Sequence, residues 1–294
     1  MITLYRPSGY DSPRASSFAG RSVDDKPLDA ENGSSFKEID TGRVFRYDKE
    51  NNLWIEQKST TGGAGATEPY TEETYDADGN LIEAKLYGYT KIRDNLYINC
   101  TALALTSLSD GLTSIGYKAF YGCTNLALTS LPTGLKSIGD GAFNTCTSLA
   151  LTSLPTGLKR IGDYTFYHCT NLALTSLPAG VTSIGISAFS NCASLALTSL
   201  PAGVTRIGYK AFGGCTNLAI ASLPAGVTSI GDSAFSDCTS LTSITFKGTP
   251  TSINSRAFSG CTNLTDIKVP WSEGAVANAP WGATNATITY NYTE

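Results

Sequence analysis

The chain has 294 residues, of which 41% are hydrophobic and 16% are charged, so its composition is that of an ordinary folded protein. Its net charge of −4 gives no reason to expect a nucleic acid or an anionic membrane as a partner. No stretch approaches roughly 18 consecutive apolar residues, the length needed to span a membrane, and residues 1–10 lack the apolar core of a signal peptide. We therefore expect no membrane span and no export through the Sec pathway.

Residues 1–30 contain Pro7, Pro13 and Pro27 among serine, arginine and aspartate residues, and they show neither a helical nor a strand period. This pattern predicts an extended arm. The arm is either a disordered tail or a segment that docks on a partner.

Residues 31–58 are different, because polar and apolar residues alternate in three short runs at 35–40, 43–48 and 53–57. The alternation predicts a three-stranded β meander. So small a sheet is only marginally stable alone, and we expect it to attach to copies of itself or to another surface. The side chains that we expect to make this attachment are Phe36, Ile39, Val44, Phe45, Tyr47 and Trp54.

Several short motifs in this region resemble a small module at the start of tailed-bacteriophage head-fibre and related virion proteins. The motifs are Asp25-Lys26-Pro27, Asn32-Gly33-Ser34, Glu38-Ile39-Asp40-Thr41-Gly42, Tyr47-Asp48 and Trp54. The resemblance implies that a capsid or tail protein is the partner of residues 1–58, with self-association of these residues as an alternative.

Residues 59–67, with the sequence S-T-T-G-G-A-G-A-T, predict a flexible linker and a domain boundary. Residues 68–99 predict the N-terminal cap of a repeat array, because Ile92 lies 23 residues before Ile115. Within this cap, residues 76–80 resemble a calcium-binding loop, but Tyr87 stands where that loop needs a glutamate. We predict a hairpin turn there instead.

The region 100–270 is organised by a 23-residue period that no insertion interrupts. The repeated phenylalanines and isoleucines keep the period of the 8 cysteines, which are Cys100, Cys123, Cys146, Cys169, Cys192, Cys215, Cys238 and Cys261. A unit this short does not bury its own apolar face, so the fixed period predicts a solenoid of stacked coils.

Each unit is predicted to contain a strand, a turn and a helical turn. Residues 126–131 predict a strand, and Pro132 ends it because proline has no amide hydrogen to donate. Asp140 is suited to cap a short helical turn in which Phe143 and Cys146 share a face. The predicted fold class is therefore a repeat solenoid with a parallel β-sheet and short helical turns, preceded by a small all-β module.

The cysteines are interpreted as a column of buried, reduced thiols. Neighbouring coils lie roughly 4.8 Å apart, which a disulfide tolerates, so distance alone leaves pairing open. Pairing would nevertheless divide the coils into two kinds, whereas all units have the same pattern. Zinc is not expected, because there is no C-x-x-C spacing and His168 is the single histidine. We expect no cofactor and no metal.

The repeat C-x-x-L…L-P-x-G-[LV]-x-[SR]-I-G-x-x-A-F-x-x-C resembles the BspA-like bacterial leucine-rich repeat family, also called the Treponema type. The resemblance implies a right-handed solenoid with a parallel sheet on one face and a role in binding or adhesion. The strand of that family reads L-x-x-I-x-I, as residues 241–246 and 264–269 do here, whereas the earlier units read L-x-[LI]-x-x-L. Either Thr129 is buried and Leu128 is exposed, or a bulge buries Leu128. We predict the second arrangement for Leu128, Leu151, Leu174 and Leu197.

Residues 271–294 leave the repeat and combine bulky aromatic residues with a final strand pattern. We predict a C-terminal cap. Exposed aromatic residues that bind a sugar are the alternative.

An enzymatic function has little support, because the single histidine has no Ser-His-Asp or Cys-His arrangement around it. Four surface positions vary freely from coil to coil while the core positions hardly change. They contain a Tyr/Lys-rich rim, which is the candidate ligand-binding surface: Tyr117, Lys118, Tyr121, Tyr164, Tyr167, His168, Tyr209 and Lys210. Tyrosine offers a large amphipathic contact area at low entropy cost. A merely solvated face is the alternative.

Two functions follow from these predictions. The first is a non-enzymatic phage virion protein, on the head or the tail, which residues 1–58 anchor and whose solenoid binds a bacterial surface protein or glycan. The second is a bacterial cell-surface adhesin of the repeat family, located outside the cell.

Overall fold

The protein is described by a computed structural model, with side chains for residues 73–86 and 88–293. Two compact units are present, Met1–Tyr89 and Thr90–Glu294. The described part of the chain contains strands and turns, and no helix in it is long and apolar enough to cross a membrane. The backbone is described for residues 3–7, 17–20, 35–38, 44–48, 53–57 and 70–293.

The first unit contains a seven-stranded sheet in the order β5-β4-β3-β2-β1-β6-β7. Neighbouring strands are antiparallel except β2 and β3, which are parallel. The strands are β1 (Thr3–Pro7), β2 (Ser17–Gly20), β3 (Ser35–Glu38), β4 (Val44–Asp48), β5 (Leu53–Gln57), β6 (Tyr70–Tyr75) and β7 (Leu81–Tyr87).

Strands β3, β4 and β5 lie in the three runs where alternation predicts a meander, and they are neighbours in the sheet. Strands β1 and β2, in contrast, lie within residues 1–30, for which we predict an extended arm. Strand β6 pairs with β1, so β6 and β7 belong to this unit. The remaining part of the predicted cap at residues 68–99 includes Lys91–Ile92, which pairs with the first repeat. The predicted linker at residues 59–67 and the side chains of the six candidate attachment residues lie outside the described residues.

Strands β6 and β7 form a hairpin whose turn is held by Asp76. The side-chain amide of Asn80 donates to this carboxylate at 3.2 and 3.0 Å, and the backbone amides of Asn80 and Asp78 donate to it at 2.8 and 3.0 Å. The hydrogen bonds from Asn80 are the main reason why the pKa of Asp76 is lowered. The hairpin turn predicted at residues 76–80 is therefore confirmed.

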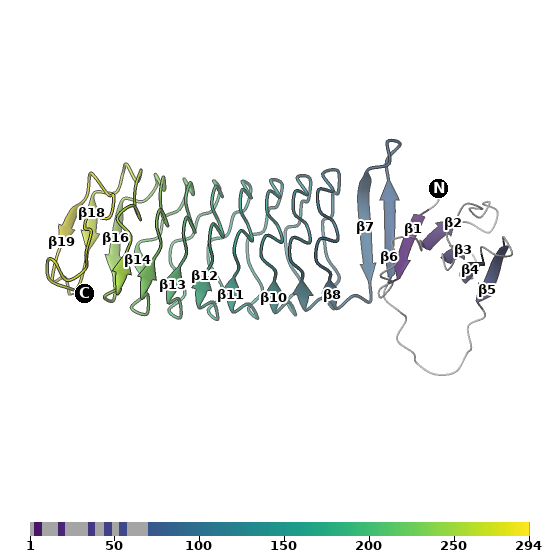
Figure 1. Ribbon diagram of the computed structural model, residues 1–294, viewed down its shortest axis with the longest axis horizontal. Coiled ribbons are helices and arrows are strands. Elements are labelled where there is room, and N and C mark those ends of the chain that lie inside the picture. The colour runs from purple at the N-terminus through teal and green to yellow at the C-terminus, as the bar shows by residue number, and fades with distance from the viewer. Residues whose placement is uncertain are drawn as a thin grey trace. The chain divides into compact units, whose positions relative to one another are not determined.

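In the second unit, successive coils contribute a ladder of short parallel strands (Figure 1). Each of these strands ends in an isoleucine, and a glycine follows that isoleucine in all but the first strand and the last. Each strand runs parallel to its counterpart 23 residues away, as Ile138 pairs with Ile115. The ladder has one break, because β8 to β10 form a first sheet and β11, β12, β13, β15 and β17 form a second. The strands are β8 (Lys91–Ile92), β9 (Ser114–Ile115), β10 (Ser137–Ile138), β11 (Arg160–Ile161), β12 (Ser183–Ile184), β13 (Arg206–Ile207), β15 (Ser229–Ile230) and β17 (Ser252–Ile253).

A further parallel sheet, in the order β14-β16-β18-β19, forms near the C-terminal end. Strands β16 and β18 lie in the two units whose segments, L-T-S-I-T-F and L-T-D-I-K-V, come closest to the family pattern L-x-x-I-x-I. The four strands are β14 (Ser222–Leu223), β16 (Ser243–Phe246), β18 (Asp266–Lys268) and β19 (Thr287–Thr289).

Residues 126–131, for which we predict a strand, do not form one. Leu126 and Leu128 are 0% exposed and Leu131 is 8% exposed, so all three point inward although their spacing is uneven. A regular strand turns successive side chains to opposite faces, so it would bury Leu126 and Leu128 but expose Leu131. The burial of all three leucines explains why no strand forms here. The predicted burial of Leu128, Leu151, Leu174 and Leu197 is confirmed, since each is 0% exposed.

Two successive turns take the place of the predicted helical turn. The amides of Asn144 and Cys146 donate to carbonyls three residues earlier, whereas those of Phe143 and Thr145 donate to the next coil. Gly141 and Thr145 have φ angles of 65° and 60°. Because a helix needs negative φ throughout, these residues exclude one and leave alternate amides free to tie neighbouring coils together.

The aspartates before this turn also bond to the neighbouring coil instead of capping their own turn. Asp140 accepts a hydrogen bond from the backbone amide of Asp163 at 3.1 Å, and Asp163 accepts one from the amide of Ile186 at 2.8 Å. The capping role that we predict for Asp140 is therefore wrong, because its partner lies one coil further along the stack.

The core contains two columns that repeat with the coils. The phenylalanine rings of successive coils are stacked, with centroids 5.2 to 5.7 Å apart. From Cys123 to Cys261 the thiols are buried, and each donates to a backbone carbonyl of the preceding coil, as Cys146 does to Phe120 at 3.0 Å. Burial raises the pKa of the Cys123 thiol to about 12. The predicted thiol column is confirmed there, while Cys100 is half-buried.

In most coils a glycine follows the strand isoleucine and lies against the backbone of the preceding coil. A Cβ at Gly139 would lie 2.5 Å from the carbonyl carbon of Gly116 and 2.5 Å from the nitrogen of Tyr117. Side-chain carbons do not approach other atoms so closely. The pair Ile-Gly therefore recurs in most coils because glycine lets the coils approach closely, although Asn254 stands at this position after Ile253.

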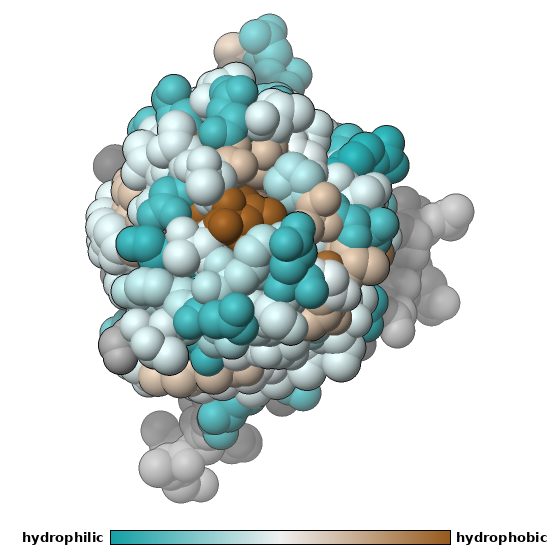
Figure 2. All heavy atoms as spheres, turned by 90° about the vertical axis from the view of Figure 1, so that its left-hand side faces the viewer, coloured by the Kyte–Doolittle hydropathy of each residue, from teal (hydrophilic) through white to brown (hydrophobic). Residues whose placement is uncertain are grey.

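Residues after the repeat close the C-terminal end of the solenoid. Trp281 is 0% exposed and Trp271 is 6% exposed, and their ring centroids lie 5.9 and 5.3 Å from that of Phe246. Figure 2 shows this end of the molecule as largely hydrophilic, with one small hydrophobic patch near its centre. The two tryptophans are thus core residues rather than exposed rings that bind a sugar.

Candidate functional site

The structure places the predicted rim in the turns that follow the strand and its glycine. The side chains of Tyr117, Tyr164 and Tyr209 are 45%, 43% and 43% exposed, whereas the phenylalanine that follows each of them within three residues is buried. The other rim residues are exposed or half-buried; they are Lys118, Tyr121, Tyr167, His168 and Lys210.

Two parts of the rim pair a lysine with tyrosine rings. The ammonium nitrogen of Lys118 lies 5.1 Å from the ring centroid of Tyr117 and 5.4 Å from that of Tyr121. The ammonium of Lys210 lies 5.5 Å from the centroid of Tyr209. These distances allow cation–π attraction, which holds the aromatic rings and the positive charge together at the surface.

A third cluster lies between these two. Tyr164 and Tyr167 are in edge contact with centroids 6.0 Å apart, and Tyr167 and His168 are also 6.0 Å apart. Lys118, Tyr164 and Lys210 occupy the same position of the repeat and succeed each other every 46 residues. The rim is therefore three separate clusters on every second coil rather than a continuous strip.

Lys118, Tyr164 and Lys210, which share one position of the repeat, have a left-handed backbone conformation. Lys118, Tyr164 and Lys210 have φ angles of 49°, 54° and 49°, and Gly141 occupies the same position with 65°. A left-handed conformation costs a residue other than glycine about 1–2 kcal/mol. The coils with small residues share this conformation, as Ser187 does with a φ of 48°, so the strain belongs to the turn of the repeat. What sets three coils apart is the large side chain that they hold at this position.

The position that contains His168 is also left-handed, since His168 has a φ angle of 57°. Its occupants include Gly122, Asn191, Gly214 and Asp237, all with positive φ. Glycine, asparagine and aspartate adopt this conformation most readily. The residue type at this position is therefore set by the left-handed backbone as well as by exposure to solvent.

His168 and Cys169 do not form a catalytic pair. His168 is exposed, whereas Cys169 is buried and its sulfur donates to the Phe143 carbonyl at 3.0 Å. Burial raises the pKa of Cys169 well above its ordinary value, so its reactive thiolate form is suppressed. Among the residues with described side chains, no group of three or more His, Cys, Asp or Glu is arranged to hold a metal ion.

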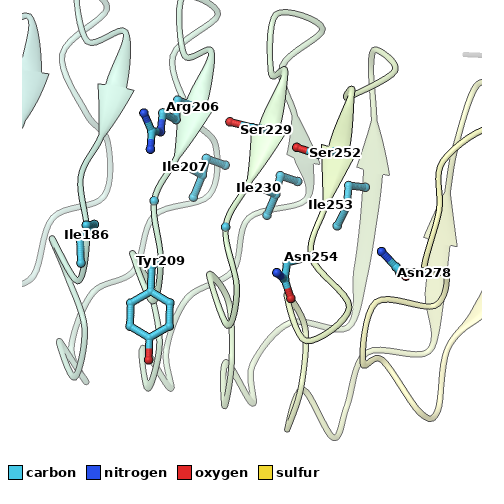
Figure 3. A pocket seen from close by; sticks show the side chains of 12 residues that line it. Ile186, Arg206, Ile207, Tyr209, Ser229, Ile230, Ser252, Ile253, Asn254 and Asn278 are labelled. Carbon is cyan, nitrogen blue, oxygen red and sulfur yellow. The ribbon is translucent and has the colours of Figure 1, made fainter.

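A groove of about 540 Å³ that sequence reasoning missed lies at the pair of Tyr209 and Lys210 and includes Tyr209 in its lining (Figure 3). It crosses three strands, β13, β15 and β17, and Tyr209 belongs to both the rim and the groove. The groove is lined by Ile186, Arg206, Ile207, Gly208, Tyr209, Ser229, Ile230, Gly231, Ser252, Ile253, Asn254 and Asn278.

Arg206 is the one charged side chain in this lining, and it has no ion pair or side-chain hydrogen bond among the described residues. The arginine two coils earlier, Arg160, is bound to the carboxylate of Asp140. Asp232, which follows Gly231, is held by Arg256 through two hydrogen bonds of 3.1 and 2.6 Å. The groove therefore contains an exposed guanidinium without a carboxylate partner.

Residues 90–219 and 187–274 match the family described as BspA type leucine rich repeat region, in 6 copies. A comparison with curated proteins gives no match.

Similar solved structures are also leucine-rich repeat proteins. One from T. pallidum is 27% identical, with 65% of this chain and 86% of that chain covered and a TM-score of 0.40. A leucine rich cell surface protein from Faecalibacterium prausnitzii is 23% identical, with 92% and 96% covered and a TM-score of 0.35. A protein from Bacteroides ovatus is 23% identical, with 69% and 76% covered and a TM-score of 0.30. None of these findings supports the resemblance to virion proteins, which stays a prediction.

Proposed function

Because this chain belongs to the BspA-type leucine-rich repeat family, we propose that it is a non-enzymatic binding protein that acts at a bacterial surface. Its solenoid recognises a surface protein or glycan, and the Tyr/Lys rim is the contact surface. The protein is located outside the cell.

The observation that carries this proposal is the exposure of Tyr164 in a left-handed position, where Gly141 stands one coil earlier. A large aromatic side chain there stabilises neither the core nor the backbone. Its edge contact with Tyr167 and the lysine-tyrosine pairs on both sides make a surface of rigid rings and positive charge. Such surfaces bind partners with little loss of side-chain entropy.

The first unit has the separate role of attachment in this proposal. The division at Tyr89 and Thr90 is compatible with an anchor followed by a displayed solenoid. The anchor binds the cell envelope, or a capsid or tail protein if the resemblance of residues 25–54 to virion modules holds. Mass spectrometry of purified phage particles and of the bacterial surface fraction distinguishes these two locations.

The rim is tested by binding of the fluorescently labelled full chain to intact bacterial cells and to an array of bacterial and host glycans. The double variant Tyr117→Ser, Tyr164→Ser should weaken saturable binding at least tenfold. The control is Thr129→Ala, Thr152→Ala, which alters exposed residues in another segment of the coils and should leave binding unchanged. Equal binding by the two variants would remove the rim from the proposal. The absence of any saturable binding would contradict the function itself.

A further inference from the structure

The lining of the groove beside β13, β15 and β17 includes two glycines, Gly208 and Gly231, that leave room in it. A Cβ at Gly208 would lie 2.7 Å from the carbonyl carbon of Gly185, and a Cβ at Gly231 would lie 2.6 Å from the nitrogen of Tyr209. Close stacking on the preceding coils thus keeps these two positions free of side chains, and Asn254 takes the same repeat position in the next coil. The hollow is a permanent part of the solenoid.

The walls of the groove carry groups of three kinds (Figure 3). Ser229 and Ser252 present hydroxyl groups from strands β15 and β17, and they are register partners on neighbouring coils. Asn254 and Asn278 add side-chain amides toward the C-terminal end. Tyr209 adds an exposed aromatic ring. Hydroxyls, amides and one aromatic ring are suited to a ligand that is rich in hydroxyl groups and has an apolar ring face.

The charge of the groove restricts the ligand further. Arg206 carries an unpaired guanidinium, and the ammonium of Lys210 lies 5.5 Å from the ring centroid of Tyr209. The carboxylate of Asp232, which follows the lining residue Gly231, is engaged by Arg256. A planar guanidinium binds a carboxylate through two parallel hydrogen bonds. The groove therefore attracts a ligand with a carboxylate group.

We propose that this groove binds a linear acidic glycan, with the carboxylate of a uronic acid unit on Arg206 and the face of a sugar ring against Tyr209. The hydroxyls of the following units bond to Ser229, Ser252 and Asn254. The coils here repeat every 5.2 to 5.5 Å, judged by the phenylalanine centroids, which is about the length of one sugar unit in an extended chain. Equivalent groups on successive coils thus meet successive units.

This inference rests on the proposed function, since it names the ligand class of a surface-binding solenoid, but it uses a different set of side chains from the rim variants above. Tyr117 and Tyr164 lie outside the groove lining.

The test is calorimetric titration of the full chain with oligosaccharides of galacturonate, mannuronate and glucuronate, and with maltotetraose as an uncharged counterpart. At least one uronate oligosaccharide should bind tenfold or more tightly than maltotetraose. Arg206→Gln should weaken this binding at least tenfold. The matched control is Arg160→Gln, which changes the same repeat position two coils earlier, where the arginine is already paired. Both arginines are exposed, and circular dichroism checks that both variants fold.

The inference is overturned if no uronate oligosaccharide binds, if maltotetraose binds as tightly, or if a glutamate-rich peptide binds more tightly than every uronate. Equal effects of Arg206→Gln and Arg160→Gln would also overturn it. If uronate binding fails while rim-dependent cell binding persists, the groove assignment alone fails. If uronate binding persists in Tyr117→Ser, Tyr164→Ser while cell binding does not depend on the rim, the rim assignment fails instead.

Discussion

Replacing Gly139 by alanine tests whether close stacking of the coils dictates the repeat sequence. The added Cβ would lie 2.5 Å from backbone atoms of Gly116 and Tyr117, neither of which is a flexible side-chain end. Neighbouring coils must separate locally, which also stretches the 2.8 Å hydrogen bond from the Gly139 amide to the Ile115 carbonyl. Overpacking costs about 1–3 kcal/mol and a lost hydrogen bond about 0.5–1.5 kcal/mol, so we expect a loss of about 2–4 kcal/mol.

The same coil offers a control. Gly134 has negative φ, and a Cβ there would lie 3.6 Å from the Leu112 carbonyl oxygen, which is an ordinary contact. Gly134→Ala should therefore be neutral or should stabilise the chain by about 0.4–1 kcal/mol through the unfolded state. Urea unfolding followed by circular dichroism should place the midpoint of Gly139→Ala about 1 M below that of the control. Midpoints that agree within about 0.2 M would refute the stacking argument.

Three further substitutions or titrations probe other features. Thr165 carries a buried hydroxyl without a hydrogen-bond partner where the neighbouring coils have alanine, so Thr165→Ala should raise the free energy of unfolding by about 1 kcal/mol; a lower melting temperature would count against this. Unfolding frees thiols to ionise above roughly pH 9, whereas the pKa of Cys215 is raised by burial to about 12 in the folded chain. Stability should therefore fall as the pH rises from 9 towards 12, and Cys215→Ala should remove about 1.4 kcal/mol per pH unit of that fall; parallel pH profiles would exclude the mechanism. Tyr164→Gly should relieve the left-handed strain and stabilise the chain by about 1 kcal/mol while it weakens binding to cells, and thermal melts with the cell-binding assay check both parts.

The burial of a side chain could be predicted from the sequence wherever the same residue type recurs in each coil. The buried columns, including Leu128 and the thiol of Cys146, follow from residue type and the 23-residue period alone. The strand could not be placed in this way, because a two-residue strand such as Ser137–Ile138 exists only through its pairing with the neighbouring coil. Its own residues show no alternation that marks it.

The candidate site was only partly predictable for a similar reason. The rim could be found because Tyr117 and Tyr164 break the pattern of a surface position. The left-handed backbone beneath Lys118 and Tyr164 leaves no trace in those residue types. The groove was missed because glycines form part of its lining. The sequence does not distinguish Gly208 from a turn glycine, since its close contact with the preceding coil is visible only in the structure. The pairing of β1 with β6, which sets the boundary between the units, is equally non-local.

The contacts between coils have a consequence for how such a chain changes in evolution. Each joins residues at a fixed offset along the sequence, as the Cys146 thiol meets the Phe120 carbonyl 26 residues earlier and Ile138 meets Ile115. If recombination duplicates or deletes one whole unit, every newly created junction inherits the same partners, and the core needs no compensating substitution. The number of coils, and with it the length of ligand that the surface spans, is therefore free to vary among descendants while the fold stays the same.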